Sequence, residues 1–126
     1  MGVGNHWRDL FAVVEKGIDM FDCVSPTRIA RNGTLFVHPS VDKAGKIDIT
    51  SGKFKDDKNP IDNYYQNPAL ANYSRAYLHH LFKTEEMLAY RLATMHNLYF
   101  LTSLMTDMRS AINADKFVEF KKKWYS

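Results

Sequence analysis

Hydrophobic positions follow different periods in the two halves of the chain. Near the start, the stretch NHWRDLFAVVEKG places Leu10, Val13 and Val14 at helical spacing, with Asn5 as the expected N-cap. The next run, IDMFDCV, has apolar residues on both faces, which is typical of a buried strand. With MGVG as the end of an earlier strand, the pattern predicts a β-α-β unit and a parallel sheet.

The middle of the chain, residues 26–72, is expected to be irregular with short strands. The stretches TLFVHP and KIDIT have period-two or β-branched character, and SGKF is expected to turn between short strands. Pro60 and Pro68 disfavour a long helix in this region.

Helical periodicity dominates after residue 72. The pattern predicts a short helix over SRAYLHHLF and a long one over TEEMLAYRLATMHNLYFLTSLMTDMRSAIN, with Thr84 as its N-cap. Because this pattern is so long, we expect a break near His96 and Asn97. Asp115 is expected to cap a last helix over KFVEFKKKW.

A sheet that begins with a parallel crossover cannot be complete with two strands, because both would remain exposed edges. The order of elements therefore favours the last piece of a larger α/β protein. The length of 126 residues itself fits one domain with a real core.

Composition adds modest constraints. The net charge of +3 permits an anionic partner without requiring one. Cys23 is the single cysteine, so an internal disulfide is excluded and a cytoplasmic location is expected. No apolar run approaches the ~20 residues of a membrane span, so no membrane partner is expected.

Candidate chemistry is concentrated in GIDMFDCVSPTRIARNG, where an apolar run ends in an acid and a cysteine and continues into two arginines. Core packing does not require that order. From the residues alone, Asp22 is either a strand-terminal acid that caps a turn or a reactive carboxylate. Arg28 and Arg31 are either two surface arginines or ligands for phosphate and splayed bases.

Five blocks occur in the order found in tRNA-guanine transglycosylases, also called queuine tRNA-ribosyltransferases: MGVG, GIDMFDCVSPTRIARNGTLF, KFKDDKNPID, NYSRAYLHHLF and MHNLYF. The chain resembles the C-terminal third of this family. The resemblance implies an α/β fold class, as the C-terminal part of a TIM-type (β/α)8 barrel with an inserted small subdomain and C-terminal helices. Residues 1–36 would be the last strand-helix-strand of the barrel with the active-site loop, residues 37–73 the subdomain, and residues 74–126 the helices.

The family exchanges the wobble guanine of GUN-anticodon tRNAs for a 7-deazaguanine base in queuosine biosynthesis. By resemblance, Asp22 is the nucleophile that forms a covalent aspartyl-ribosyl intermediate, and Met1 is the residue that lies against the bound base. Cys23 is interpreted as a small buried filler. Trp7 could equally be a packing residue. The positions that match tRNA-contact regions are Trp7, Arg8, Thr27, Arg28, Ile29, Ala30 and Arg31.

The chain departs from the family at its structural zinc site. The family uses a C-x-C-x-x-C cluster before SRAYLHHL and a later histidine. The three cysteine positions are Tyr65, Asn67 and Leu70 here, and only His96 is retained. A single imidazole cannot form a structural site. We therefore expect no cofactor, loss of the family zinc, and a hydrogen-bonded core role for His96.

The family's acid/base aspartate and most of its base-recognition residues lie earlier in the barrel. The implied partners are therefore tRNA, a 7-deazaguanine base, and an N-terminal barrel portion or partner chain. Homodimerisation through the helical region, common in the family, stays open. Three functions compete: a part of the transferase, a non-catalytic tRNA-binding or partner subunit of the same family, and an inactive remnant.

Overall fold

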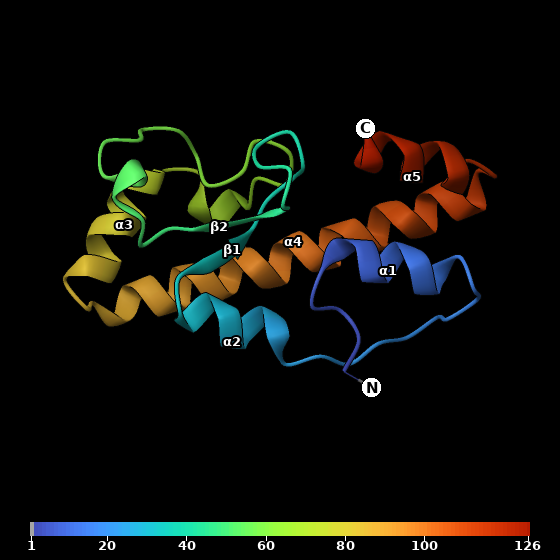
Figure 1. Cartoon of the computed structure of the whole chain (residues 1–126), viewed down its shortest axis with the longest axis horizontal. Coiled ribbons are helices and arrows are strands. Elements are labelled where there is room, and N and C mark those ends of the chain that lie inside the picture. Colours follow the sequence, from blue (N-terminus) through green and yellow to red (C-terminus); the bar gives the residue numbers. More distant parts are fainter. Residues whose placement is uncertain (1) are drawn as a thin grey trace.

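A computed structural model of the protein describes residues 2–126 and shows a mostly helical fold with a two-stranded sheet (Figure 1). The elements are α1 (Trp7–Val14), α2 (Ser25–Arg31), β1 (Thr34–Phe36), β2 (Lys46–Asp48), the 3-10 turns η1 (Gly52–Phe54) and η2 (Pro68–Leu70), α3 (Arg75–Lys83), α4 (Met87–Asn113) and α5 (Phe117–Tyr125). Helix α4 has 27 residues and runs the length of the molecule, and the other elements lie along it (Figure 1).

Helix α4 contributes to two hydrophobic clusters, one along each half of its length. The first half of the helix packs with α2, the sheet and α3, through residues such as Leu92, Ala30 and Ile47. The second half packs with α1 and α5, through residues such as Phe100 and Trp124. The apolar residues of α4 therefore pack against elements at both ends of the protein.

The sheet is antiparallel, with Leu35 opposite Ile47. Beyond the strands, Val37 N donates to Gly45 O at 3.1 Å and Ile49 N donates to Gly33 O at 2.9 Å. Because strand residues alternate in direction, the intervening Thr34 and Phe36 turn their polar backbone groups away from β2 and toward α4.

Two α4 side chains satisfy that outer edge of β1. Asn97 Oδ1 accepts from Phe36 N at 2.9 Å, and Asn97 Nδ2 donates to Thr34 O and Pro26 O at 3.0 Å each. His96 Nε2 donates to Phe36 O at 2.6 Å. The strand edge is therefore covered by a helix, and its buried polar groups are paired without a third strand.

The expected helix break at His96 and Asn97 is wrong, because α4 is continuous from Met87 to Asn113. His96 and Asn97 are polar residues in an otherwise apolar helix face because their side chains hydrogen-bond to β1. Thr84 closes α3 and does not cap α4, since its Oγ1 donates to His80 O at 3.0 Å. The turn between these helices falls at Glu85, whose φ is +55°.

Several other predicted elements are confirmed. The short helix expected over SRAYLHHLF forms as α3, and both short strands form. The structure adds the cap of α3, since the Ser74 side chain accepts from Tyr77 N at 3.1 Å. Helix α1 forms as well, but its cap is His6 and not Asn5. Helix α2 was not predicted, because Pro26 suggested irregular chain; proline is favourable in the first turn, where no intrahelical N–H is needed.

The expected parallel strands at the start of the chain are wrong for the described residues, since residues 2–6 and 18–24 form no strand. Gly2 N donates to Asp22 O at 3.0 Å, so the two segments lie side by side. Met20 and Val24 are 87% and 62% exposed. A ladder buried on both faces needs neighbouring strands and covering helices, which these segments lack here.

The three segments predicted from the sequence, residues 1–36, 37–73 and 74–126, pack against one another. Strand β1 belongs to residues 1–36, pairs with β2 in residues 37–73, and rests on α4 in residues 74–126. Within residues 2–126, none of the helices is both long and apolar enough to cross a membrane.

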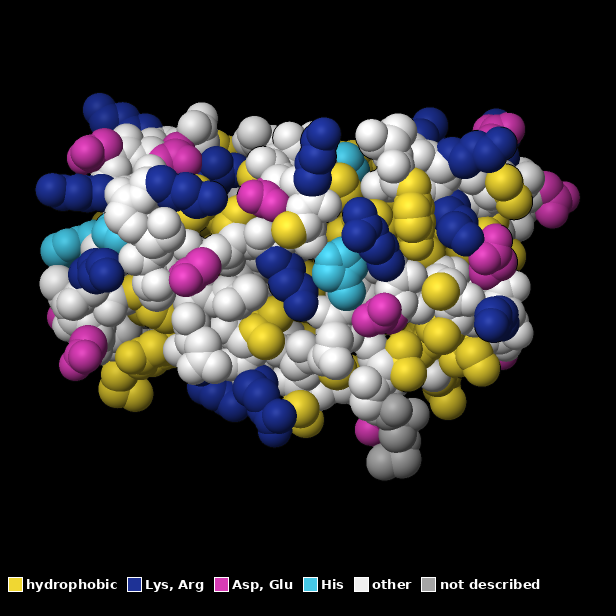
Figure 2. All heavy atoms as spheres, viewed as in Figure 1, with side chains coloured by type: hydrophobic (Ala, Val, Ile, Leu, Met, Phe, Trp, Pro, Cys, Tyr) yellow, Lys and Arg dark blue, Asp and Glu magenta, His cyan; other side chains and the backbone are white. Residues whose placement is uncertain are grey.

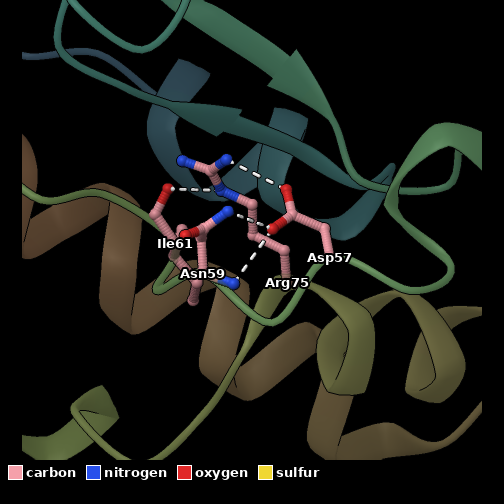
Figure 3. A network of polar contacts seen from close by, with 4 residues as sticks. All are labelled: Asp57, Asn59, Ile61 and Arg75. Atoms are coloured by element: carbon pink, nitrogen blue, oxygen red, sulfur yellow. Dashed lines mark hydrogen bonds and ion pairs between the residues drawn. The ribbon is translucent and has the colours of Figure 1, made fainter.

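A buried ion pair joins the loop after η1 to the start of α3 (Figure 3). Arg75 Nη1 lies 3.1 Å from Asp57 Oδ2, and Arg75 Nε donates to Ile61 O at 3.2 Å. Asp57 Oδ1 also accepts from Asn59 N and Nδ2, at 2.9 and 2.7 Å. Burial alone would raise the pKa of Asp57, but the hydrogen bonds from Asn59 and Arg75 outweigh it and lower the pKa.

Substituting Asn97→Ala is expected to reduce the free energy of unfolding by about 3 kcal/mol, because it removes three buried or part-buried hydrogen bonds to the backbone of β1 and α2. Urea unfolding measures the change. The matched control is Asn113→Ala, at the exposed end of the same helix, which should cost no more than about 0.5 kcal/mol. Equal losses in the two variants would contradict the proposed role of Asn97.

Substituting Asp57→Asn is expected to lower stability at neutral pH and to matter less in acid. The folded-state pKa of Asp57 lies below its ordinary value of 3.8, so the folded protein binds fewer protons there. The stabilisation is therefore full above pH 3.8 and is lost as the pH falls through the folded-state pKa. Urea midpoints from pH 7 to pH 3 should converge for wild type and variant. The exposed neighbour supplies the control, Asp56→Asn, whose midpoint should track wild type throughout.

Candidate functional site

Asp22 lies in the extended segment that joins α1 to α2, and its side chain is exposed. Its backbone oxygen accepts from Gly2 N, which places the start of the chain beside it. A second contact joins the same segments, because Cys23 Sγ lies 3.9 Å from Asn5 Oδ1. The structure thus brings together two regions that the sequence marked for chemistry. Met1 lies outside the described residues.

The neighbours of Asp22 line a groove. Phe21 and Cys23 face it together with Leu10, Pro26 and α4 residues such as Met105. Side chains alternate along an extended segment, so Asp22 is directed to the other side of the chain, toward solvent. A carboxylate in this position is accessible to a large substrate.

Cys23 is half-buried and has structural contacts. Its Sγ accepts from Ser25 N at 3.3 Å, at the start of α2. Gly4 approaches closely, with a φ of +124° that side-chain-bearing residues rarely adopt. These contacts are those of a small residue that joins Asp22 to the next helix.

Helix α2 presents two of the predicted RNA-contact residues to solvent. Arg28 and Arg31 are exposed and lie three apart, so they occupy neighbouring positions on one helix face. Thr27 is half-buried and its Oγ1 donates to Val24 O at 3.1 Å, which fixes the first turn. The two arginines are therefore neighbours on one helix face, a few residues after Asp22 in the sequence.

Three of the predicted RNA-contact residues lie at least partly inside the protein in this structure. Ala30 belongs to the core beneath α2, and Ile29 is packed against the second cluster. Trp7 is fully buried, with its ring 5.4 Å from that of Trp124. An indole enclosed in this way cannot stack on a nucleic-acid base, so Trp7 is a packing residue.

Arg8 follows Trp7 and is exposed. Its guanidinium carbon lies 5.0 Å from the Trp7 ring centre and 5.9 Å from that of Tyr125. This stacking orients the side chain along an aromatic surface and leaves its hydrogen-bond donors accessible.

Lys46 is a nearby cation that the sequence did not single out. Its Nζ lies 5.3 Å from the Phe36 ring centre. Burial lowers the pKa of Lys46, while Asp9 and Cys23 act in the opposite direction. The sequence could not identify Lys46 as part of this region, because its neighbours Asp9 and Cys23 lie in α1 and in the segment before α2.

Cations on the visible face do not form one continuous patch. Figure 2 shows Lys and Arg side chains spread over it and interspersed with Asp and Glu. Hydrophobic side chains gather over the end of α1 and the segment that follows (Figure 2), where Ile18 is 48% exposed. Across the described part of the chain, no group of three or more His, Cys, Asp or Glu is arranged to hold a metal ion.

Comparison with known proteins identifies one family. The queuine tRNA-ribosyltransferase family matches residues 1–126. The queuine tRNA-ribosyltransferase of Thermoanaerobacter sp. (strain X514) is 50% identical over 125 residues, which are 99% of this chain and 32% of that protein. That of Caldanaerobacter subterraneus subsp. tengcongensis is 50% identical over 129 residues, 99% of this chain and 33% of that protein.

A third relative, the queuine tRNA-ribosyltransferase of Clostridium perfringens (strain SM101 / Type A), is 50% identical over 123 residues. These are 98% of this chain and 31% of that protein. The chain therefore spans about a third of the length of the curated relatives it matches.

Proposed function

Because the chain belongs to the queuine tRNA-ribosyltransferase family, we propose that it forms the C-terminal part of a tRNA-guanine transglycosylase. The observation that carries this proposal is 50% identity over 99% of the chain. The relatives are about three times as long, so the complete enzyme needs the remaining two-thirds from elsewhere.

In the proposed reaction, an Asp22 oxygen attacks the ribose C1′ of the wobble guanosine. The C1′–O bond forms as the C1′–N9 bond to guanine breaks, which leaves a ribosyl-enzyme ester. Guanine departs with a proton from a general acid in the remaining part of the enzyme. The incoming 7-deazaguanine base then attacks C1′ through its ring nitrogen, loses its proton, and releases the carboxylate. Solvent exposure of Asp22 supports this role.

Arg28 and Arg31 are proposed to hold the phosphates or splayed bases around the wobble position. Guanidinium groups form paired hydrogen bonds with phosphate and stack on unpaired bases. Both are exposed on the helix that begins three residues after Asp22. Arg8 is a further proposed contact, whereas Trp7 and Ala30 act through packing.

The segment 18–24 is proposed to be a strand of the complete (β/α)8 barrel. Its exposed apolar side chains, including Met20, and the groove beside Phe21 support this, because strands of such a barrel are buried on both faces. Pairing with strands from the remaining two-thirds would cover these residues and hold Asp22 at the strand end.

The test of the proposed nucleophile uses this chain assembled with the N-terminal two-thirds of the enzyme. Incorporation of labelled guanine into tRNA should fall at least about a thousandfold in Asp22→Ala, because no covalent intermediate can form. The matched control is Asp19→Ala, another exposed acid of the same segment, which should retain activity. A denaturant-resistant tRNA–protein adduct should appear with the control and not with Asp22→Ala.

Equal activity of the two variants would exclude Asp22 as the nucleophile. Tight tRNA binding by the assembled wild-type protein without incorporation would identify a non-catalytic tRNA-binding subunit instead.

Substituting Arg28→Ala or Arg31→Ala is expected to weaken anticodon stem-loop binding by about tenfold each and to reduce the salt dependence of binding by about 0.7 per lost phosphate contact. Titration at several salt concentrations measures both quantities. Arg91→Ala removes an exposed arginine from α4 and serves as the control, with no expected change. A loss of the same size in Arg91→Ala would show a general charge effect and contradict a specific contact.

A further inference from the structure

The positions that match the family's zinc ligands still meet in space. Tyr65, Asn67, Leu70 and His96 line one small cavity between the loop after Ile61 and the middle of α4. The loop and the helix are thus brought together at the place where the family resemblance puts the metal. What differs is the chemistry of three of the four side chains.

None of the first three supplies a zinc thiolate, and each has another contact. Tyr65 OH donates to Asp107 Oδ2 at 2.6 Å. Asn67 Oδ1 accepts from Ala69 N at 2.9 Å and caps η2. Leu70 is 4% exposed and belongs to the first hydrophobic cluster. Zinc in structural sites takes four cysteine or histidine ligands, so these residues do not fit the group.

His96 is 2% exposed and its Nε2 bonds to Phe36 O. A carbonyl oxygen only accepts, so Nε2 carries the proton, and only Nδ1 of this ring could offer a lone pair to a metal. One such ligand cannot form a structural zinc site. The retained histidine therefore binds the strand edge.

The same loop has further polar attachments. Asp62 is buried, and its carboxylate accepts from His38 N at 2.8 Å and from Tyr64 N at 2.7 Å. Together with the Arg75–Asp57 pair, these contacts join the loop to the sheet side and to α3. An irregular segment of this length needs such connections, because it has no regular backbone ladder of its own.

From this arrangement we infer that the protein has replaced its family's structural metal with direct contacts: Tyr65 to Asp107, His96 to β1, and Leu70 to the core. The subdomain folds without zinc, and the Tyr65–Asp107 bond performs the cross-linking between loop and α4 that a metal would otherwise provide. This inference depends on family membership and not on the proposed activity, because its test needs neither tRNA nor base exchange.

The test measures metal content and thermal unfolding of the full chain produced in zinc-supplemented medium. We expect less than about 0.1 zinc per chain, and a melting temperature that excess chelator shifts by no more than about 1 °C. One zinc per chain, with a melting temperature that falls on chelation, would overturn the inference.

A conservative pair of variants tests the replacement itself. Tyr65→Phe removes only the hydroxyl that donates to Asp107 and is expected to lower the melting temperature by about 4 °C. Tyr77→Phe, at a 41% exposed position on α3, should leave it within about 1 °C of wild type. Equal melting temperatures for the two variants would show that the Tyr65–Asp107 bond does not hold the loop.

Discussion

The bonds from Asn97 to the backbone join three elements of this protein, namely α4, β1 and α2. One amide side chain bonds Phe36 and Thr34 on the edge of β1 and Pro26 at the start of α2. An unpaired strand edge inside a protein is costly, and an apolar residue at this position could not satisfy it. The helix that follows Asp22 is therefore fixed to α4 through the same side chain that closes the sheet. The orientation of Arg28 and Arg31 depends on this arrangement.

The C-terminal half of α4 packs against α1 and α5. Trp7, Phe11 and Trp124 form an aromatic cluster in which α5 folds back over α1. Gly45 packs against the Trp7 indole, where a Cβ would overlap the ring, and its φ of +69° also favours glycine. The loop between the strands is thereby held on α1. Helices α1 and α2, which flank the segment with Asp22, both pack against α4. The segment between these two helices has exposed apolar residues.

The two proposals concern separate regions. The proposed chemistry belongs to the exposed segment before α2. The loop around Tyr65 is already complete within the chain, because its polar groups and apolar side chains have partners in the sheet, α3 and α4. Where the family resemblance places a metal, we infer that direct bonds join the loop to α4 instead. The physical requirement is that the loop be joined to the helix, and the chain meets it with hydrogen bonds.

The amino-acid sequence by itself determined the local features: the periodicity of α3 and α4, the two short strands, and the family, through blocks such as DMFDCV and SRAYLHHL. Each depends on neighbours within one or two turns of chain, which a sequence pattern records. Tertiary structure decided the rest. It kept α4 continuous through His96 and Asn97, buried Trp7 and Ala30, and left residues 18–24 without a sheet. The continuity of α4 and the burial of Trp7 and Ala30 depend on partners about sixty or more residues away, which no local pattern encodes.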